Sequence, residues 1–358
     1  MALPSLLISS LEQSGIRRVM TRAAEFPDAI HLEVGEPGFV TPRHITDAAH
    51  QAALDGFTGY TADVGLSSLR DALAQAATFY HGDETFPEEI CVTVGGIGAL
   101  FGGIRAVVDT DDEVLIPDPG WPNYAMVVEA AAARPVRYPL RAENHYLPDI
   151  DEIEAMLSER THALIINSPS NPLGTVFPER LMQELVELTR RRDLWLISDE
   201  VYHRLLFEGE HNSAWRFHSG GRLIVVGSFS KTYAMTGWRV GYALAPPPVI
   251  ELYAKIQEAT VSNAATPSQK AAEAALLGPQ DCVQAMLATY TRNREVVILC
   301  TQGVADRPRR RGLHDHRVVG PSRIGNQHLV VGVHHSATPL PKRRPSTTAT
   351  RPSPKRSA

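Results

Sequence analysis

The sequence predicts an α/β fold in which helices cover a mostly parallel sheet. Short apolar runs of four or five residues alternate with longer segments whose apolar residues recur at helical spacing. The runs are continuous, as in strands that are buried on both faces. A polar or glycine-rich loop follows each of the five runs at once. Open α/β sheets bind ligands at such loops, beyond the carboxyl ends of their strands.

Three helices are predicted before residue 200. The first spans Pro42–Gly56, with Thr41 as its candidate N-cap and a glycine as its stop. The second spans Gly65–His81, carries an apolar stripe and ends before Gly82. The third spans Pro178–Arg192 and places three leucines on one face. All three are amphipathic and are therefore expected to cover the sheet.

Five strands are predicted, at Ile90–Val94, Glu113–Ile116, Ala163–Ile166, Leu194–Ile197 and Leu223–Val226. The polar loops after them begin at Gly95, Asp118, Asn167, Asp199 and Ser228. Because the carboxyl ends of parallel strands meet at one edge of a sheet, we expect these five loops to form one shared site.

Length and composition indicate an ordinary globular protein of 358 residues, large enough for one big domain or two unequal ones. Its three cysteines lack CxxC spacing, which argues against a disulfide framework or a zinc site. The first 20 residues do not resemble a signal peptide, and no apolar stretch approaches the roughly 18 residues that span a bilayer. We therefore expect a cytoplasmic enzyme without a bound metal.

The charge of the chain is unevenly distributed. Residues 301–358 contain twelve Lys or Arg and two acidic residues, although the whole chain has a net charge of −5. All aromatic residues lie before position 300, the last being Tyr290. Two different kinds of sequence therefore meet near Cys300.

Lys231 follows the last predicted strand, and a lysine amine can form a Schiff base with an aldehyde cofactor when its pKa is lowered. The hydroxyls of Ser228 and Ser230 and the forked cation of Arg239 are suited to a phosphate. A lysine in such a string, taken alone, is more often a solvated loop residue.

Four further loops carry candidate residues. Asp199, at the end of a buried strand, could pair with a pyridinium nitrogen, although a helix N-cap is the simpler interpretation. Asn171 lies in a proline-rich segment that is also a turn. The glycine turn at Gly95–Gly98 could bring backbone amides to a phosphate, or could serve only strand–helix packing. Trp121 could stack on a ring or pack in the core.

Together these motifs resemble the class I and II pyridoxal-phosphate-dependent aminotransferases, of the aspartate aminotransferase superfamily and fold type I. The string from Ser228 to Gly241 is similar to the pyridoxal-lysine signature of that family. The motifs follow in the family's order from about Glu33 to Gly241, and weaker similarity continues to about Leu299. The resemblance implies a three-layer α/β/α large domain, pyridoxal 5'-phosphate as cofactor, and a homodimer.

The resemblance also implies catalytic roles. Lys231 would hold the cofactor and later act as general base. Asp199 would keep the ring nitrogen protonated, and Tyr202 and Asn171 would hydrogen-bond the ring oxygen. Glu200 receives no role.

The remaining roles concern binding. Asn171 would also contact the substrate carboxylate, together with the backbone at Gly35, and Trp121 would stack on the ring. In many relatives Ser, Thr or Lys stands where this chain has Ile97, so any contact there would come from the backbone. The phosphate would be held by Gly95, Gly96, Ile97, Ser228, Arg239 and, from the neighbouring subunit, Tyr60.

The resemblance ends with the basic tail. Relatives continue with a small domain, which carries a segment like Gly-Ala-Phe-Tyr and an Arg-x-Ser string whose arginine binds the substrate's α-carboxylate. From about Thr301 this chain has neither. A basic tail that binds nucleic acid or another anion, a substitute small domain and an out-of-frame C-terminus are the three interpretations. We favour the last, because the composition changes abruptly, and reading the coding DNA in the other two frames tests it.

We therefore expect a large domain with an incomplete small domain. The expected regions are an N-terminal arm and the start of the small domain at 1–45, a large cofactor-binding domain at 46–288, the start of an inter-domain helix at 289–300, and an atypical basic tail, disordered or out of frame, at 301–358.

The predicted reaction is amino-group transfer between an amino acid and a 2-oxo acid, with turnover by this particular chain left open. We expect neither nucleic acid nor membrane as a partner. The same scaffold hosts carbon–sulfur β-lyases, which release pyruvate and ammonia without a 2-oxo acid acceptor. A non-catalytic cofactor-binding remnant is the other alternative.

Overall fold

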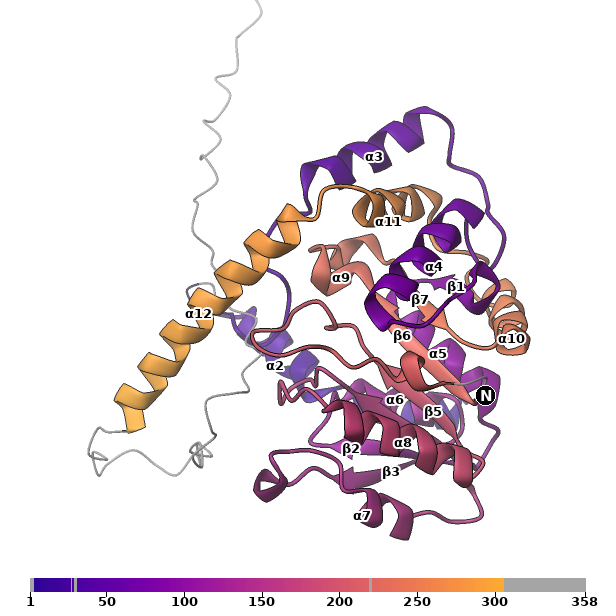
Figure 1. Ribbon diagram of the computed structural model, residues 1–358, viewed down its shortest axis with the longest axis vertical. Coiled ribbons are helices and arrows are strands. Elements are labelled where there is room, and N and C mark those ends of the chain that lie inside the picture. Colours follow the sequence, from indigo (N-terminus) through magenta and orange to yellow (C-terminus); the bar gives the residue numbers. More distant parts are fainter. Residues whose placement is uncertain (1–2, 27, 29–30, 219–220, 306–358) are drawn as a thin grey trace, which may run out of the picture.

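The computed structural model describes residues 3–26, 28, 31–218 and 221–305 (Figure 1). The predictions for the basic tail from residue 306 onward lie outside the described residues. None of the helices in the described part of the chain combines the length and the apolar character that crossing a lipid bilayer requires.

The described residues form a seven-stranded sheet in the order β1-β7-β6-β5-β4-β2-β3. Only β7 is antiparallel to its neighbours, so the other six strands run in one direction. The five predicted strands and their common direction are confirmed. The strands are β1 (Ile90–Thr93), β2 (Glu113–Asp118), β3 (Arg134–Pro139), β4 (Thr161–Asn167), β5 (Trp195–Asp199), β6 (Leu223–Ser228) and β7 (Gly241–Leu244).

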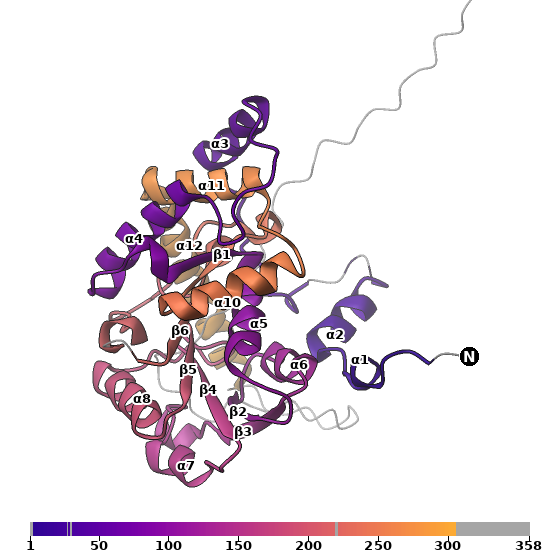
Figure 2. The same cartoon turned by 90° about the vertical axis from the view of Figure 1, so that its right-hand side faces the viewer.

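Helices cover both faces of this sheet, which confirms the three-layer α/β/α architecture. Figure 2 shows α5, α6 and α10 on one side of the strands and α4 and α8 on the other. The helices are α1 (Leu6–Ser10), α2 (Gly15–Ala23), α3 (Arg43–Leu54), α4 (Ser67–His81), α5 (Gly95–Val107), α6 (Asn123–Ala130), α7 (Ile150–Ala155), α8 (Glu179–Arg191), α9 (Phe229–Thr232), α10 (Pro247–Glu258), α11 (Thr266–Leu277) and α12 (Asp281–Ala305).

The central strands are buried on both faces, as their continuous apolar character predicts. In β4, Leu164 and Ile166 belong to one hydrophobic cluster, whereas Ala163 and Ile165 belong to the other. The same alternation continues along β6. Because neither face is left to water, the residues at the centre of these strands are apolar or small, and they form unbroken apolar runs in the sequence.

The three predicted helices correspond to α3, α4 and α8, each within two residues of the expected ends. Gly82 ends α4 in the left-handed region, with φ +78°. The expectation for Thr41 is wrong, because the N-cap of α3 is Pro42. The Thr41 hydroxyl instead donates to the carbonyl of Ala234, at 2.6 Å.

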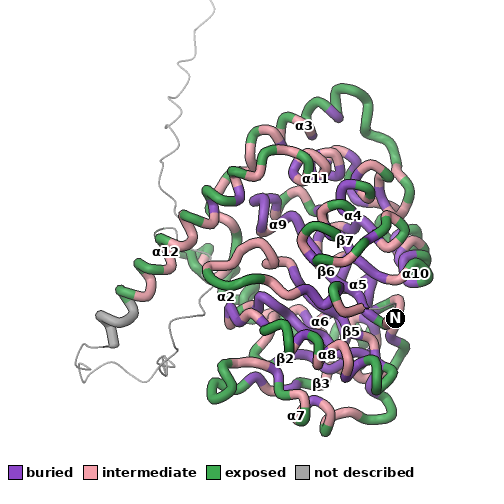
Figure 3. Tube along the Cα trace, viewed as in Figure 1, coloured by how far each residue is buried: buried purple, intermediate pink, exposed green. Residues whose placement is uncertain are grey.

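The helix expected at 289–300 begins earlier, at Asp281, and continues to Ala305. It extends away from the sheet as a single rod (Figure 1), and its outer part is partly exposed (Figure 3). Two of its apolar side chains, Val296 and Leu299, are 59% and 68% exposed. This helix therefore presents apolar side chains to solvent, and the expected domain boundaries remain predictions.

Candidate active site

Lys231 lies on α9, a single helical turn that follows β6. Ser228 caps this turn, because its hydroxyl accepts the backbone N–H of Ser230 at 3.2 Å. The turn presents Lys231 to the N-terminal segment, where its ammonium donates to the carbonyl of Gly35. Burial lowers the pKa of Lys231; Glu36 opposes that shift and Arg239 adds to it. More of the amine is therefore neutral, and able to act as a nucleophile or base, than in a solvated lysine.

The N-terminal segment is fastened to the lysine loop by three more hydrogen bonds, none of which the sequence analysis predicted. Glu36 accepts from the hydroxyl of Thr236. Thr41 donates to Ala234 and accepts the indole N–H of Trp238 at 2.9 Å. One edge of the site is thus closed by the side chains of Glu36, Thr41, Thr236 and Trp238.

Asp199 ends β5 and is 4% exposed. Its carboxylate accepts the phenolic O–H of Tyr124 at 2.7 Å and the backbone N–H of Val201 at 3.3 Å. Burial raises the pKa of Asp199 to about 6, although these two hydrogen bonds oppose the shift. Tyr124 was not predicted from the sequence as a site residue. It stands three residues after Trp121 at the start of α6, and the two rings lie edge to face with centroids 5.5 Å apart.

The loops after β4 and β5 are joined through Asn167. Its side-chain amide donates to the carbonyl of Asp199 at 2.9 Å, and its oxygen accepts the backbone N–H of Asn171 at 2.6 Å. Burial, with a smaller contribution from Asp199, raises the pKa of Tyr202, and a hydrogen bond with Asn171 opposes this. Asp199, Asn171 and Tyr202 are therefore brought together, as the sequence analysis predicted.

The glycine turn, Ser228 and Arg239 also converge. Gly95 begins α5 with φ +71°, and a Cβ there would lie 2.5 Å from the Arg239 guanidinium. A Cβ on Gly96 would lie 3.3 Å from the Ser228 Cβ. The N-cap residue of α5 makes no side-chain cap hydrogen bond, and Ile97 is half-buried in the first turn. The site therefore fits the phosphate of pyridoxal phosphate, because it combines the N-terminus of α5 with the hydroxyl of Ser228 and the guanidinium of Arg239.

Tyr60 is the predicted site residue that this chain does not bring to the others. It lies between α3 and α4, and it is 89% exposed. The half-buried Trp121 and the backbone of Gly35 do lie at the same edge, through Tyr124 and Lys231 respectively.

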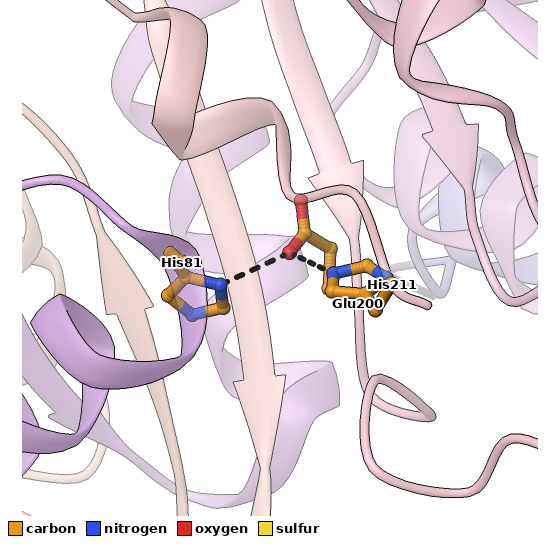
Figure 4. A group of neighbouring side chains, drawn as sticks. All are labelled: His81, Glu200 and His211. Atoms are coloured by element: carbon orange, nitrogen blue, oxygen red, sulfur yellow. Dashed lines mark hydrogen bonds and ion pairs between the residues drawn. The ribbon is translucent and has the colours of Figure 1, made fainter. Parts of the chain in front are cut away.

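Glu200, which follows Asp199 directly, belongs to a separate buried cluster. Figure 4 shows His81 and His211 on either side of its carboxylate. Burial alone raises the pKa of Glu200, but the charge of His211 and its hydrogen bond outweigh burial, and the pKa falls to about 2. Burial lowers the pKa of His81 to about 4 and that of His203 to about 3. This cluster was not predicted from the sequence.

Comparison with known proteins gives consistent results. A family model described as "Aminotransferase class I and II" matches residues 27–300. Over 274 residues the chain is 37% identical to an aspartate/prephenate aminotransferase of Thermus thermophilus, covering 76% of this chain and 71% of that protein. It is 35% identical over 292 residues to an arginine–pyruvate transaminase of Pseudomonas aeruginosa, covering 81% and 74%.

Solved structures show the same likeness. The chain is similar to an aspartate aminotransferase from Thermus thermophilus determined with maleate, with a TM-score of 0.82 and 34% sequence identity. The match covers 85% of this chain and 81% of that one. The match to the family model ends at residue 300, where the composition of the sequence changes.

Proposed function

This chain belongs to the class I and II aminotransferase family and is a pyridoxal-phosphate-dependent aminotransferase, and from that premise we propose how its residues divide the work. The observation that carries the proposal is the convergence of Lys231, Asp199 and the Gly95–Arg239 contact at one edge of the sheet. When bound, pyridoxal phosphate supplies an aldehyde that receives the amino group and a ring that withdraws electrons.

Lys231 would attach the cofactor and later carry the proton of the substrate's α-carbon on its Nζ atom. The lowered pKa of Lys231 supports this, because a general base must be available in its neutral form near neutral pH. The carbonyl of Gly35, which accepts from Nζ, orients the amine toward the site. Loss of that contact when the cofactor binds would free the Gly35 carbonyl, while the hydrogen bonds of Glu36 and Thr41 would keep the segment beside the site.

Asp199 would hold a proton on the cofactor's ring nitrogen. Its two hydrogen bonds leave it oriented, and its burial makes an unpaired negative charge unfavourable. A cationic ring nitrogen would relieve that cost. Tyr124 acts through Asp199 and is therefore a positioning residue. Asn171 and Tyr202, which are hydrogen-bonded to one another, would bind the ring oxygen.

Gly95, Gly96, Ile97, Ser228 and Arg239 would bind the phosphate, and Trp121 would stack on the ring. Glycine at position 95 leaves room for the Arg239 guanidinium, and the adjacent backbone N–H groups of α5 are without a side-chain cap. The contact is thus a charge-assisted one at a helix N-terminus.

The amino donor is not specified by family membership. The two relatives described above are named for aspartate or prephenate in one case and for arginine in the other. We propose an amino acid and a 2-oxo acid as substrates, with Gly35 and Asn171 near the substrate carboxylate. No observation favours the carbon–sulfur β-lyase alternative.

We also propose a homodimer in the cytoplasm. The high exposure of Tyr60 supports a role outside its own subunit, because an aromatic ring that is 89% exposed contributes little to the fold of its own chain. Sedimentation of the purified protein should give twice the 39.2 kDa mass of the chain. A monomer that retains the cofactor fully would contradict the role of Tyr60, and cell fractionation would test the location.

The cofactor site is tested by the visible absorption of protein purified with pyridoxal phosphate and freed of excess cofactor. We expect the wild type and Lys255→Ala, which changes an exposed lysine on α10, to keep an absorption band that Lys231→Ala loses. Adding glutamate or aspartate should then shift the wild-type band. A band that survives in Lys231→Ala would contradict the assignment of Lys231. A band that no donor changes would identify the non-catalytic alternative.

A further inference from the structure

The cluster behind Asp199 has no role in amino transfer. It consists of His81 at the end of α4, Glu200 directly after β5, and His211 in the loop that follows. Their side chains are 2%, 1% and 6% exposed. Three residues that can each bind a metal thus meet in the interior, and one ligand atom from each lies within 4.8 Å of the others.

Glu200 is held so that one oxygen faces both imidazoles. Its Oε1 accepts the hydroxyl of Ser198 at 2.9 Å and the backbone N–H of Ala214 at 3.0 Å. Its Oε2 lies 2.7 Å from Nε2 of His211 and 3.8 Å from Nδ1 of His81. The two bonds to Oε1 orient the carboxylate in the way that outer partners orient metal ligands.

The cluster is incompletely satisfied by protein atoms alone. The Nδ1 atom of His81 points at Oε2 of Glu200 but has no hydrogen-bond partner, and it is buried. The Nδ1 atom of His211 is also buried without one. Buried polar atoms in folded proteins nearly always have a partner, so an orphaned nitrogen aimed at a carboxylate indicates a missing group between them.

We propose that His81 Nδ1, Glu200 Oε2 and His211 Nε2 bind a zinc ion. Two imidazoles and a carboxylate are a ligand set that zinc accepts, and a water molecule would complete its tetrahedron. Zinc would replace the proton between His211 and Glu200. Zinc–ligand distances of about 2.0–2.2 Å require ligand atoms roughly 3.3 Å apart, so the 2.7 Å contact must open slightly and the 3.8 Å contact must close.

The His81 side of the cluster borders a small cavity. This cavity of about 20 Å³, enough for one water molecule, lies against His81 and His203 but is lined by neither Glu200 nor His211, so it gives room for movement of His81 only. The ion would join the end of α4, the end of β5 and the loop after it, one residue beyond Asp199. The ion would not contact the substrate, because it lies behind the strand end and not among the residues that face the cofactor.

The cysteine spacing that argued against zinc does not bear on this site, which contains no cysteine. His81 is separated from Glu200 and His211 by more than a hundred residues. Only the packing of α4 against the strands brings His81 to the other two.

The test is zinc content of the full-length, cofactor-loaded protein after removal of metal with a chelator, incubation with zinc and dialysis. The tail itself contains histidines 314, 316, 328, 334 and 335, so the decisive quantity is a difference between variants. We expect His81→Gln and His211→Gln to bind one zinc fewer per chain than the wild type. The control His162→Gln changes a surface histidine 3.3 Å from Asp112 and should bind as much as the wild type.

Thermal unfolding gives a second readout. Zinc should raise the unfolding midpoint of the wild type and of His162→Gln but not that of His81→Gln, because an ion bound only by the folded state stabilises it. Equal zinc content in the wild type and both cluster variants would overturn the proposal. If the cluster variants do not fold, zinc X-ray absorption of the wild type decides between a shell of two imidazoles and one carboxylate, which supports the site, and any other shell, which refutes it.

Discussion

The buried carboxylate of Asp199 destabilises the cofactor-free protein when it is ionised, whereas the same negative charge would help to bind the cofactor. It accepts two hydrogen bonds at the end of β5, yet burial still raises its pKa to about 6 from 3.8. The raised pKa means that the cofactor-free fold binds a proton at Asp199 more tightly than the unfolded chain does. A cationic group beside Asp199 would reverse this preference.

A pH dependence of stability follows for the cofactor-free protein. Because the folded pKa lies above the unfolded one, the stabilisation from protonated Asp199 is complete below about pH 4 and is lost as the pH rises through about 6. Relative to Asp199→Asn, which cannot ionise, the wild type should therefore lose up to about 3 kcal/mol between pH 4 and pH 7. Urea unfolding of both proteins at the two pH values measures the difference.

Asp47→Asn provides the control, because Asp47 is 64% exposed on α3. It should show no comparable pH dependence relative to the wild type. If the Asp199→Asn difference stays constant across this range, Asp199 is ionised throughout and the burial argument fails. Asp199→Asn should also retain pyridoxal phosphate less well than the wild type. The substitution should therefore stabilise the cofactor-free fold at pH 7 but weaken cofactor binding.

At the scale of elements, the turn between β1 and α5 depends on the backbone of Gly95. The positive φ of +71° is one that side chains disfavour, and the space where a Cβ would stand is filled by Arg239. The end of β1, the start of α5 and Arg239 thus pack together in a way that only a residue without a side chain at position 95 allows. This explains why a glycine, rather than any small residue, stands at the first position of α5.

Gly95→Ala should weaken binding of pyridoxal phosphate about tenfold or more, equivalent to roughly 1.4 kcal/mol. The alanine displaces the guanidinium and also strains the backbone. Gly56→Ala is a matched control, because Gly56 has φ +86° but open space where its Cβ would stand. Both variants should lose similar stability in urea, whereas only Gly95→Ala should lose cofactor in an absorbance titration. Equal cofactor affinities would show that Arg239 does not contact the phosphate.

The N-terminal segment is a second element whose role depends on long-range contacts. Thr41 bonds to the lysine loop near residue 234, and the Phe39 ring meets Tyr290 of α12 edge to face, with centroids 5.3 Å apart. The segment therefore lies between the loop that carries Lys231 and the long terminal helix. Its position links α12 to the site even though α12 contributes none of the proposed cofactor residues.

At the scale of the whole molecule, the proposed cofactor site is complete before the basic tail begins. Its residues lie between Gly35 and Arg239, and the family match ends at residue 300. The arginine that relatives use for the substrate's α-carboxylate has no counterpart identified in the sequence. Cofactor binding and substrate binding are therefore expected to respond differently to changes in the tail.

A chain ending at Ala305 should bind pyridoxal phosphate with the same affinity as the full chain, within about twofold. It should also unfold at the same urea concentration, because the described core is built from residues before the tail. Absorbance titration and urea unfolding of the two proteins measure this. A truncated chain that loses its cofactor or its fold would show that the tail is an integral part of the structure and is not out of frame.

The sequence by itself determined the sheet's main strands, their common direction and the central residues of the site. Buried strands leave unbroken apolar runs, and the string around Lys231 keeps its chemistry within a few consecutive residues. Two strands were not predicted. Edge strand β3 contains Arg134 and Arg137, and β7 is only four residues long and begins with glycine, so neither has the signal of a buried strand.

Only the tertiary structure decided which distant side chains complete the site. Tyr124 meets Asp199 across 75 positions of sequence, and Thr41 meets the lysine loop across 193. Of the three residues proposed to bind zinc, His81 ends α4, whereas Glu200 and His211 lie in the loop after β5. Such pairs leave no periodicity or spacing in the sequence, because the distance between them is set by how helices and loops pack onto the sheet. Local patterns therefore identified the lysine and the strands, whereas packing selected the residues that surround them.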